Sequence, residues 1–291
     1  MTHAITVRKI PFDFSNDISP HWHPKQREWG HMINGASLTM PYLEPFLNRT
    51  LREALGKLSD STLHQDVEGF IRQEAQHYAN HRRYNEMLKA NGYAVLADIE
   101  ATFAADYAAL EKRSLEWRLA YSAGFETMTM GITDWLVNER SSLFYGANPA
   151  VTSLVLWHMV EETEHKAVAY DVYETLCGRY WLRIAGLVWG SLHVGFMSRR
   201  AYRAILQQDG VWNTVKGGLG IWIMVGRFFK NAGGAMLRAL RPGYHPNQIA
   251  DPPWVDQWRL AYAAMHSDKL PLLDTSQRDI PPRFGIGGAN E

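Results

Sequence analysis

Two stretches of the sequence, FIRQEAQHYANH at residues 70–81 and LWHMVEETEHK at residues 156–166, share the pattern Glu-x-x-His. Each has the composition of a long helix, and a spacing of three residues places two helical side chains on one face. Each pattern therefore directs a carboxylate and an imidazole toward a common point. The residues concerned are Glu74, His77, Glu162 and His165. Two such pairs are typical of a two-metal site in a four-helix bundle.

Two further carboxylates precede these pairs, each by about one helix. Glu126 is the only acidic residue between Trp117 and Thr133, and its neighbours are small or apolar. Glu44 lies in the apolar segment MPYLEPFL, whereas Glu53 lies in an amphipathic segment typical of a solvated face. A carboxylate in apolar surroundings is costly unless it is paired or binds a cation. We therefore expect Glu44 and Glu126 to complete the site.

Apolar periodicity and capping residues predict an all-α fold, a four-helix bundle with additional C-terminal helices. The predicted helices begin and end near residues 40–55, 61–90, 93–112, 114–142 and 149–178. Around them we expect three parts packed as one domain. Residues 1–40 form an irregular N-terminal arm, 41–178 the di-metal bundle, and 179–291 an apolar helical extension with a loose tail.

A further histidine extends each metal-binding stripe. His158, Glu162 and His165 follow the spacing i, i+4, i+7, and His81 lies one turn beyond His77 on the other helix. One of the two outer histidines can bind metal directly while the other holds a ligand carboxylate or relays a proton. We favour His158 as the ligand, and we expect His81 and Glu161 as candidate proton carriers. The predicted ligands are Glu44, Glu74, His77, Glu126, His158, Glu162 and His165.

Other polar residues receive plainer interpretations. Glu161 and Glu164 lie off the ligand stripe and are expected either in solvent or behind the ligands. The sequence leaves open whether Asp134 and Asp171 hydrogen-bond the ligand histidines. The alternation His21-Trp22-His23 suggests a ligand pair, but surface histidines in a loop are the expected case.

The donor types restrict the cofactor. A single cysteine, Cys177, excludes both an internal disulfide framework and a cysteine-ligated cluster, so nitrogen and oxygen must bind any metal. Four carboxylates neutralise two divalent cations. We expect two metal ions, in the first place iron, with manganese and zinc as alternatives.

Composition excludes several classes of function. The 291 residues are 46% hydrophobic and 21% charged, with a formal net charge of zero, so nothing favours a nucleic-acid partner. The first residues lack the apolar stretch of a secretory signal, which predicts a cytoplasmic protein. A homodimer is compatible with these features.

Two apolar stretches in the C-terminal part suggest a membrane contact. Residues 184–198 and 217–226 contain no charged residue, but both are shorter than the roughly 18 to 20 residues that span a bilayer. Packed core helices are the plainer interpretation. The alternative is that residues 181–229 wall an apolar substrate tunnel or touch the inner face of the membrane. Tryptophans beside basic residues support that alternative: Trp181, Trp189, Trp212, Trp222, Arg183, Arg199, Arg200, Lys216 and Arg227.

Two resemblances follow from these motifs. The order of ligands resembles the ferritin-like di-iron carboxylate superfamily, and the stripe His158-x3-Glu162-x2-His165 is similar to its p-aminobenzoate N-oxygenase type, which has an additional histidine. More of the chain, about residues 5–270, resembles a bacterial family of predicted metal-dependent hydrolases through FIRQEAQHYANHRRYN, LRPGYHPN and the tryptophan-containing arm. The resemblance implies metal binding at the predicted ligands and names no substrate. Pro45, directly after Glu44, departs from the pattern and would be expected to shift that carboxylate.

Three functional hypotheses remain. The first is a di-iron oxygenase or oxidase that uses O2 to oxidise a small apolar or aromatic substrate. The alternative is a hydrolase in which two metal ions activate a water molecule. Metal binding without catalysis is the third, and it is disfavoured because a storage cage needs acidic patches that this charge-balanced chain lacks.

Overall fold

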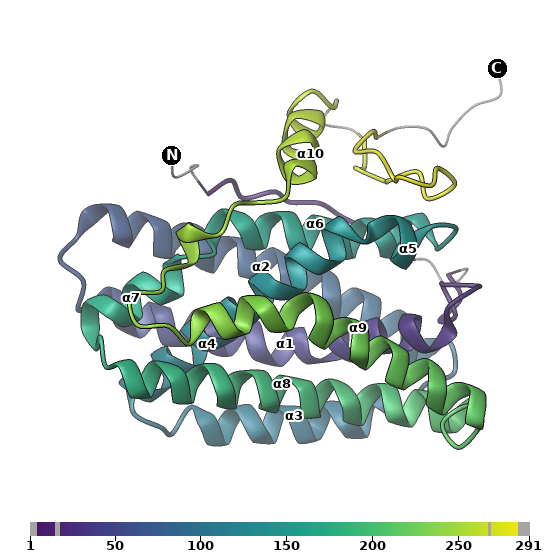
Figure 1. The fold of residues 1–291 in the computed structure, drawn as a ribbon, viewed down its shortest axis with the longest axis horizontal. Coiled ribbons are helices and arrows are strands. Elements are labelled where there is room, and N and C mark those ends of the chain that lie inside the picture. Colours follow the sequence, from purple (N-terminus) through teal and green to yellow (C-terminus); the bar gives the residue numbers. More distant parts are fainter. Residues whose placement is uncertain (1–4, 15–17, 267–268, 285–291) are drawn as a thin grey trace.

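The computed structural model describes residues 5–14, 18–266 and 269–284, and these form an all-α fold (Figure 1). The α-helices are α1 (Arg27–Leu55), α2 (Ser61–Ala90), α3 (Leu96–Leu110), α4 (Leu115–Asn138), α5 (Arg140–Phe144), α6 (Pro149–His165), α7 (Val168–Leu176), α8 (Tyr180–Gln208), α9 (Val215–Ala239) and α10 (Pro253–Ala263). Within the described ranges, strand-type pairing is limited to an isolated bridge between Leu273 and Phe284. The all-α prediction is confirmed, whereas the ferritin-like assignment stays a prediction.

Capping residues begin the two Glu-x-x-His helices where the sequence predicts. The Asp60 side chain accepts hydrogen bonds from the backbone N–H groups of Thr62 and Leu63 at the start of α2. At the start of α6, Asn148 caps the helix and Pro149 occupies the first turn, where its missing N–H costs nothing. Local contacts therefore fix where α2 and α6 each begin, and with it the position of each ligand stripe along its helix.

Helix α1 begins at Arg27 rather than near Met40, so the expected irregular arm is too long at its C-terminal end. Pro41 and Pro45 lie in the helix interior instead of its first turn. A proline there removes the bond to the carbonyl four residues earlier, and neighbouring groups must satisfy that carbonyl. The Ser37 carbonyl, freed by Pro41, accepts a hydrogen bond from Asn85 Nδ2 at 3.0 Å.

Two predicted long helices are each interrupted. The helix predicted for 149–178 is divided into α6 and α7 at Lys166 and Ala167, directly after His165. The Lys166 ammonium group is held there by the Ile249 carbonyl at 2.7 Å and by Asp251 at 2.8 Å. The helix predicted for 114–142 is divided into α4 and α5 at Glu139, whose carboxylate pairs with Arg227 of α9. In both cases a contact from the C-terminal part of the chain fixes the residue at the break.

Small residues allow α8 and α9 to pack closely on α4. A Cβ atom added to Gly124 of α4 would lie 2.4 Å from the backbone of Gly186 in α8. Further along α4, a Cβ atom on Gly131 would lie 3.1 Å from the Ala232 carbonyl of α9. These crossings fix the position of α4 close to Glu126.

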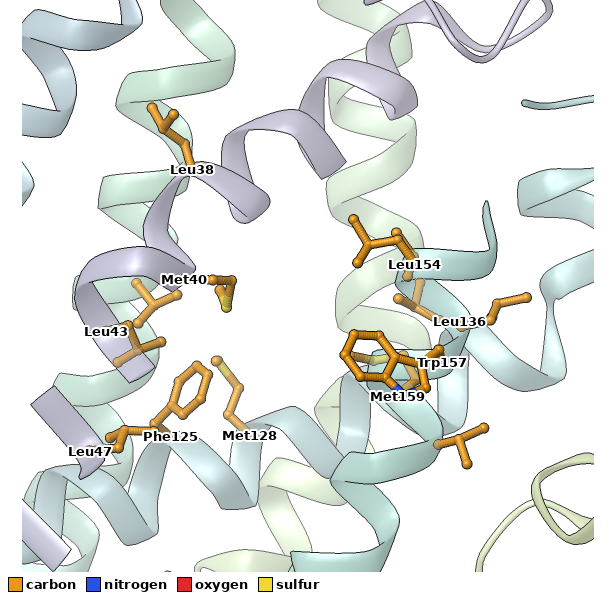
Figure 2. Close-up of a cluster of buried hydrophobic side chains, with 14 of the residues drawn as sticks. Leu38, Met40, Leu43, Leu47, Phe125, Met128, Leu136, Leu154, Trp157 and Met159 are labelled. Carbon is orange, nitrogen blue, oxygen red and sulfur yellow. The ribbon is translucent and has the colours of Figure 1, made fainter. Parts of the chain in front are cut away.

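A continuous apolar core joins the parts of the chain. Figure 2 shows Met40 and Leu43 of α1 near Phe125 and Met128 of α4. The same cluster of buried side chains extends to the arm and the C-terminal part, with members such as Phe12, Trp22, Leu187, Trp258 and Ile280.

The described part of the tail is bound to the bundle rather than loose. The Leu273 N–H donates to Ser153 Oγ at 2.8 Å, and the Gly146 N–H donates to the Thr275 carbonyl at 2.8 Å. Trp254 Nε1 donates to the Ile280 carbonyl at 3.0 Å. The remainder of the expected loose end, residues 285–291, lies outside the described residues.

Candidate metal centre

The predicted ligands converge in the interior of the bundle. Glu44 comes from α1, the pair Glu74 and His77 from α2, Glu126 from α4, and the stripe of three residues from α6. All are buried, and His158, at 6% exposure, is the most exposed of the set. Helices distant in sequence thus bring together every residue that the sequence nominated as a ligand.

The ligands form two adjacent groups. Glu44, His77 and His158 make one group, and Glu74, Glu162 and His165 make the other. Within each group, one potential ligand atom per residue lies within 4.8 Å of the others. The arrangement therefore offers two positions for a cation.

Glu74 and Glu162 connect the two groups. Glu74 Oε1 is 3.7 Å from His77 Nδ1 and 3.2 Å from His165 Nε2. Glu162 Oε1 is 2.8 Å from His158 Nε2, and its Oε2 is 3.4 Å from His165 Nε2. Carboxylates that touch imidazoles of both groups are in position to bridge two ions.

Glu44 and Glu126 each contact an imidazole of one group only. Glu44 Oε1 is 3.7 Å from His158 Nε2, and Glu126 Oε2 is 3.6 Å from His165 Nε2. Although Pro45 follows it directly, the Glu44 carboxylate lies at the centre. Glu53, on the same helix, instead forms an ion pair with Arg118.

The described residues leave most carboxylate oxygens of this centre without a hydrogen-bond partner. Both carboxylate oxygens of Glu44, Glu74 and Glu126 are buried and have no hydrogen-bond partner among the described residues. Burial raises the pKa of Glu44 and Glu126 well above the usual value, and the nearby carboxylates raise it further. Burial also opposes ionisation of Glu162, but His165 and His158 lower the pKa of that carboxyl. Buried charges of one sign need a compensating cation, and two divalent ions fit this donor set.

Hydrogen bonds outside the centre aim two imidazoles inward. His77 Nε2 donates to Glu161 Oε2 at 3.0 Å, which leaves the Nδ1 lone pair facing the carboxylates. His165 Nδ1 donates to Gln73 Oε1 at 2.9 Å, which leaves its Nε2 lone pair facing them. Such partners fix both the tautomer and the ring orientation of a ligand histidine. His77 would therefore bind through Nδ1 and His165 through Nε2.

A longer chain orients His158. Asn85 Nδ2 donates to the Ser37 carbonyl, so its Oδ1 must accept the Ser37 hydroxyl proton, at 2.8 Å. The Ser37 oxygen then accepts from His81 Nδ1 at 2.8 Å. Burial lowers the pKa of His81 well below its usual value and keeps the ring neutral, so its Nε2 accepts from His158 Nδ1 at 2.8 Å.

The last step of this chain leaves the His158 Nε2 lone pair directed at Glu44 and Glu162. The assignment of protons follows from the partners, since only one pattern gives every hydrogen bond a donor. His158 thus lies beside the carboxylates of the centre and His81 behind it, and direct metal binding by His158 stays a prediction.

The acids off the stripe support the ligands and are not solvated. Glu161 is fully buried between His77 and Arg8, and Arg8 also binds Glu164 at 2.7 Å. Glu164 additionally accepts a hydrogen bond from Gln73 at 2.7 Å. Of the two alternatives for these acids, a position behind the ligands is correct. Because both Glu161 oxygens are engaged, this residue is a poor proton carrier.

Two other candidates do not reach the ligand histidines. Asp171 pairs with His245, and Asp134 accepts from Asn138. Sequence patterns also do not identify the orienting residues Arg8, Gln73, Ser37 and Asn85. Asn85 alone could have been found from the sequence, because it lies four residues after His81 and continues the α2 stripe.

His21 and His23 do not share a site. His21 joins His31 and Asp209 in a further histidine-carboxylate group, with each Nε2 atom 2.9 Å from Asp209 Oδ2. His23 is buried, contrary to expectation, and its Nδ1 accepts the Gln26 N–H at 3.2 Å.

The fold and the centre define a helical protein with a buried carboxylate- and histidine-rich candidate metal site. The model of a family described as "Predicted metal-dependent hydrolase" matches residues 6–250, so the chain belongs to that family. No curated protein and no solved structure matches significantly. The comparisons therefore support metal dependence and give no support to the N-oxygenase resemblance.

None of the helices in the described ranges combines the length and apolar composition that a bilayer crossing requires.

Proposed function

We propose that the chain is an enzyme that uses two iron ions and O2 to oxidise a small apolar or aromatic substrate. One observation supports this most directly: three imidazoles present lone pairs to four buried carboxylates, two of which touch imidazoles of both groups. A Glu from each of two helices and Glu-x-x-His from each of two others is the donor pattern of di-iron and di-manganese carboxylate proteins. When bound, the iron pair would supply the electrons for O2 reduction.

The chain's own residues would hold, orient and protect the ions. The carboxylates of Glu44, Glu74, Glu126 and Glu162 would hold the ions together with the three imidazoles. Phe70 lies with its ring 4.6 Å from that of His165, and Trp157 lies 5.0 Å from His77, so apolar rings cover the imidazoles and exclude water. His81 would keep the His158 Nδ1 proton in place, so that the Nε2 lone pair of His158 stays available to an ion.

Hydrolysis is the second candidate, and the family description supports it rather than oxidation. Two metal ions can polarise an ester, amide or phosphate and lower the pKa of a bound water. A hydrolase also needs a free base near that water. Glu161 is engaged by His77 and Arg8, and both nitrogens of His81 are engaged by Ser37 and His158, so neither predicted proton carrier is free to act as that base.

One experiment separates the two functions. The protein would be stripped of metal, loaded anaerobically with Fe(II) and mixed with O2 while visible absorption and O2 consumption are followed. We expect a transient visible band and O2 uptake that the Glu162→Ala variant loses. An Asp209→Asn variant, altered outside the centre, should behave like the unaltered protein. Absence of O2 uptake, together with zinc in the purified protein and cleavage of a chromogenic ester or phosphate, would establish the hydrolase instead.

A further inference from the structure

Helices α8 and α9 expose large apolar side chains where a surface helix normally carries polar ones. Trp181 is 78% exposed and Phe196 61% on α8, and Trp222 is 73% exposed on α9. The other large apolar side chains exposed on these helices are Val188, Trp189, Leu192, Val215, Leu219, Ile223, Phe229 and Leu237. The exposed tryptophans of the described residues all belong to this group. We call the group the apolar face.

These side chains recur at helical spacing opposite the buried face. On α8, Trp181, Val188, Leu192 and Phe196 are outward, while Gly186 packs on α4. On α9, Leu219, Trp222 and Phe229 are outward while Ala232 packs on α4. The prediction of packed core helices is therefore correct for one side of each helix only.

The two helices present the apolar face on one side of the protein. Arg183 of α8 donates to the Ala239 carbonyl of α9 at 2.6 Å, which links the start of α8 to the end of α9. At the opposite end, Tyr202 and Leu206 of α8 form a buried cluster with Ile221 of α9. In Figure 1, α9 lies next to α8 at the loop that joins the two helices and slants away from it toward its other end. A flat partner can thus reach both helices at once.

The segment that carries the apolar face is rich in exposed basic residues. Between Glu174 and Asp251 the only acidic residue is Asp209, whose carboxylate is bound by His21, His31 and Tyr93. Six exposed basic residues in this segment form no ion pair with any described residue: Arg199, Arg203, Lys216, Lys230, Arg238 and Arg241. The net charge of the whole chain is zero, so this concentration is local.

The charge decides between the possible occupants of this face. In a two-fold dimer the same patch meets its own copy, which would set basic residues against basic residues. An anionic bilayer complements the charge, and tryptophan and arginine are favourable at the level of the lipid headgroups. Helices that are apolar outward and basic at the margins lie in the plane of such an interface.

We propose that the apolar face of α8 and α9 docks on an anionic membrane surface. Trp189, Phe196 and Trp222 enter the boundary between headgroups and acyl chains, and Arg199, Lys216 and Lys230 pair with lipid phosphates. The protein lies on one leaflet and does not cross it. This inference rests on surface residues and is independent of the chemistry proposed for the metal centre.

Vesicle flotation tests the proposal. The protein would be mixed with vesicles of phosphatidylcholine alone or with phosphatidylglycerol added, and the floating fraction measured at low and high salt. We expect flotation with the anionic vesicles only and its loss at high salt. Trp189→Ser with Trp222→Ser should abolish it, and Arg199→Glu with Lys230→Glu should weaken it by more than about tenfold, since each charge contributes near the surface.

Matched controls remove one apolar and one basic residue elsewhere. Val95→Ser alters a side chain that is 40% exposed outside the face, and Lys112→Glu alters an exposed lysine. Both should float like the unaltered protein, and helical content and bound metal should be unchanged in every variant. Failure of the unaltered protein to float would overturn the proposal. So would equal flotation of all variants, or a dimer by light scattering that only the tryptophan variants dissociate.

Discussion

The bundle centre and the group of His21, His31 and Asp209 look alike by distance, because each holds carboxylate and imidazole atoms within 4.8 Å. They differ in what else touches the carboxylates. Asp209 Oδ1 accepts from Tyr93 at 2.7 Å, and Oδ2 contacts both histidines and Arg27. The carboxylates of Glu44, Glu74 and Glu126 contact only imidazoles of the centre and accept no hydrogen bond from any described residue.

The pKa values follow this difference. Burial opposes ionisation of Asp209, but Tyr93 and the histidines hold the pKa of this carboxyl below its usual value. At the bundle centre, burial raises the pKa of Glu44 and Glu126. The comparison teaches that ligand-like spacing does not define a metal site. The better indication of a metal site is a set of buried carboxyl groups that the protein leaves without hydrogen-bond partners.

The largest effect is expected from Glu162→Ala. This change removes a carboxylate that touches both groups, so we expect loss of nearly all of about two bound ions per chain. Asp209→Asn, the matched change in the other group, should leave metal content unaltered. Metal would be measured by inductively coupled plasma mass spectrometry after dialysis. Equal loss in both variants would show that the two groups do not differ as described.

The next effect concerns the imidazole that completes the first group. His158→Ala should lower metal content by about one ion per chain, because a direct ligand is lost. Ser37→Ala leaves the ligands in place and breaks the chain that orients His158. It should weaken metal binding by about tenfold to a hundredfold, the usual cost of losing an orienting partner. Full metal affinity in Ser37→Ala, measured by competition with a chelator, would contradict the assigned tautomer.

A smaller effect is expected from packing beneath the centre. Gly124→Ala places a methyl group 2.4 Å from the Gly186 backbone, so α4 and α8 must separate. We expect a loss of about 2 to 3 kcal/mol in the free energy of unfolding, measured by urea denaturation. Gly195→Ala is the control, since its added methyl meets nothing within 4 Å. It should stabilise α8 by about 0.5 to 1 kcal/mol.

The smallest effect is a pH dependence at the second group. Burial lowers the pKa of His31 to about 4, although Asp209 opposes the shift. In the unfolded chain the ring takes up a proton near the ordinary histidine pKa of 6.5, whereas burial in the fold opposes protonation. The contribution is therefore present above pH 6.5 and is lost as the pH falls toward 4.

His31→Gln should accordingly reduce the acid loss of stability by about 1 to 2 kcal/mol. Urea denaturation of both proteins at several pH values measures the difference. A variant whose pH profile parallels that of the unaltered protein would show that His31 does not remain neutral in the fold.

Part of the fold could be predicted because its signals are local. The caps Asp60 and Asn148 fix the starts of α2 and α6, and the apolar surroundings of Glu126 and Glu44 distinguish them from Glu53. The start of α1 could not be predicted. Prolines usually mark a helix start, and only packing with Asn85 makes Pro41 acceptable inside the helix.

The ion pairs behind the candidate ligands could not be predicted from the sequence either. Arg8 and Glu161 are 153 positions apart, and no sequence period connects them. Glu164 lies off the ligand stripe, as a solvated acid would, and only the fold shows that Arg8, Arg259 and Gln73 engage it.

The sequence by itself determined the all-α class and nominated the candidate ligands, because side chains three or four residues apart share one face of any helix. Only the tertiary structure decided which outer histidine enters the centre. His158 faces the carboxylates because His81, Ser37 and Asn85 fix its proton on Nδ1, and these residues come from α1 and α2. The tertiary structure also decided which of the two histidine-carboxylate clusters has carboxylates without hydrogen-bond partners. That property depends on the distant side chains that reach each carboxylate, such as Tyr93 at Asp209.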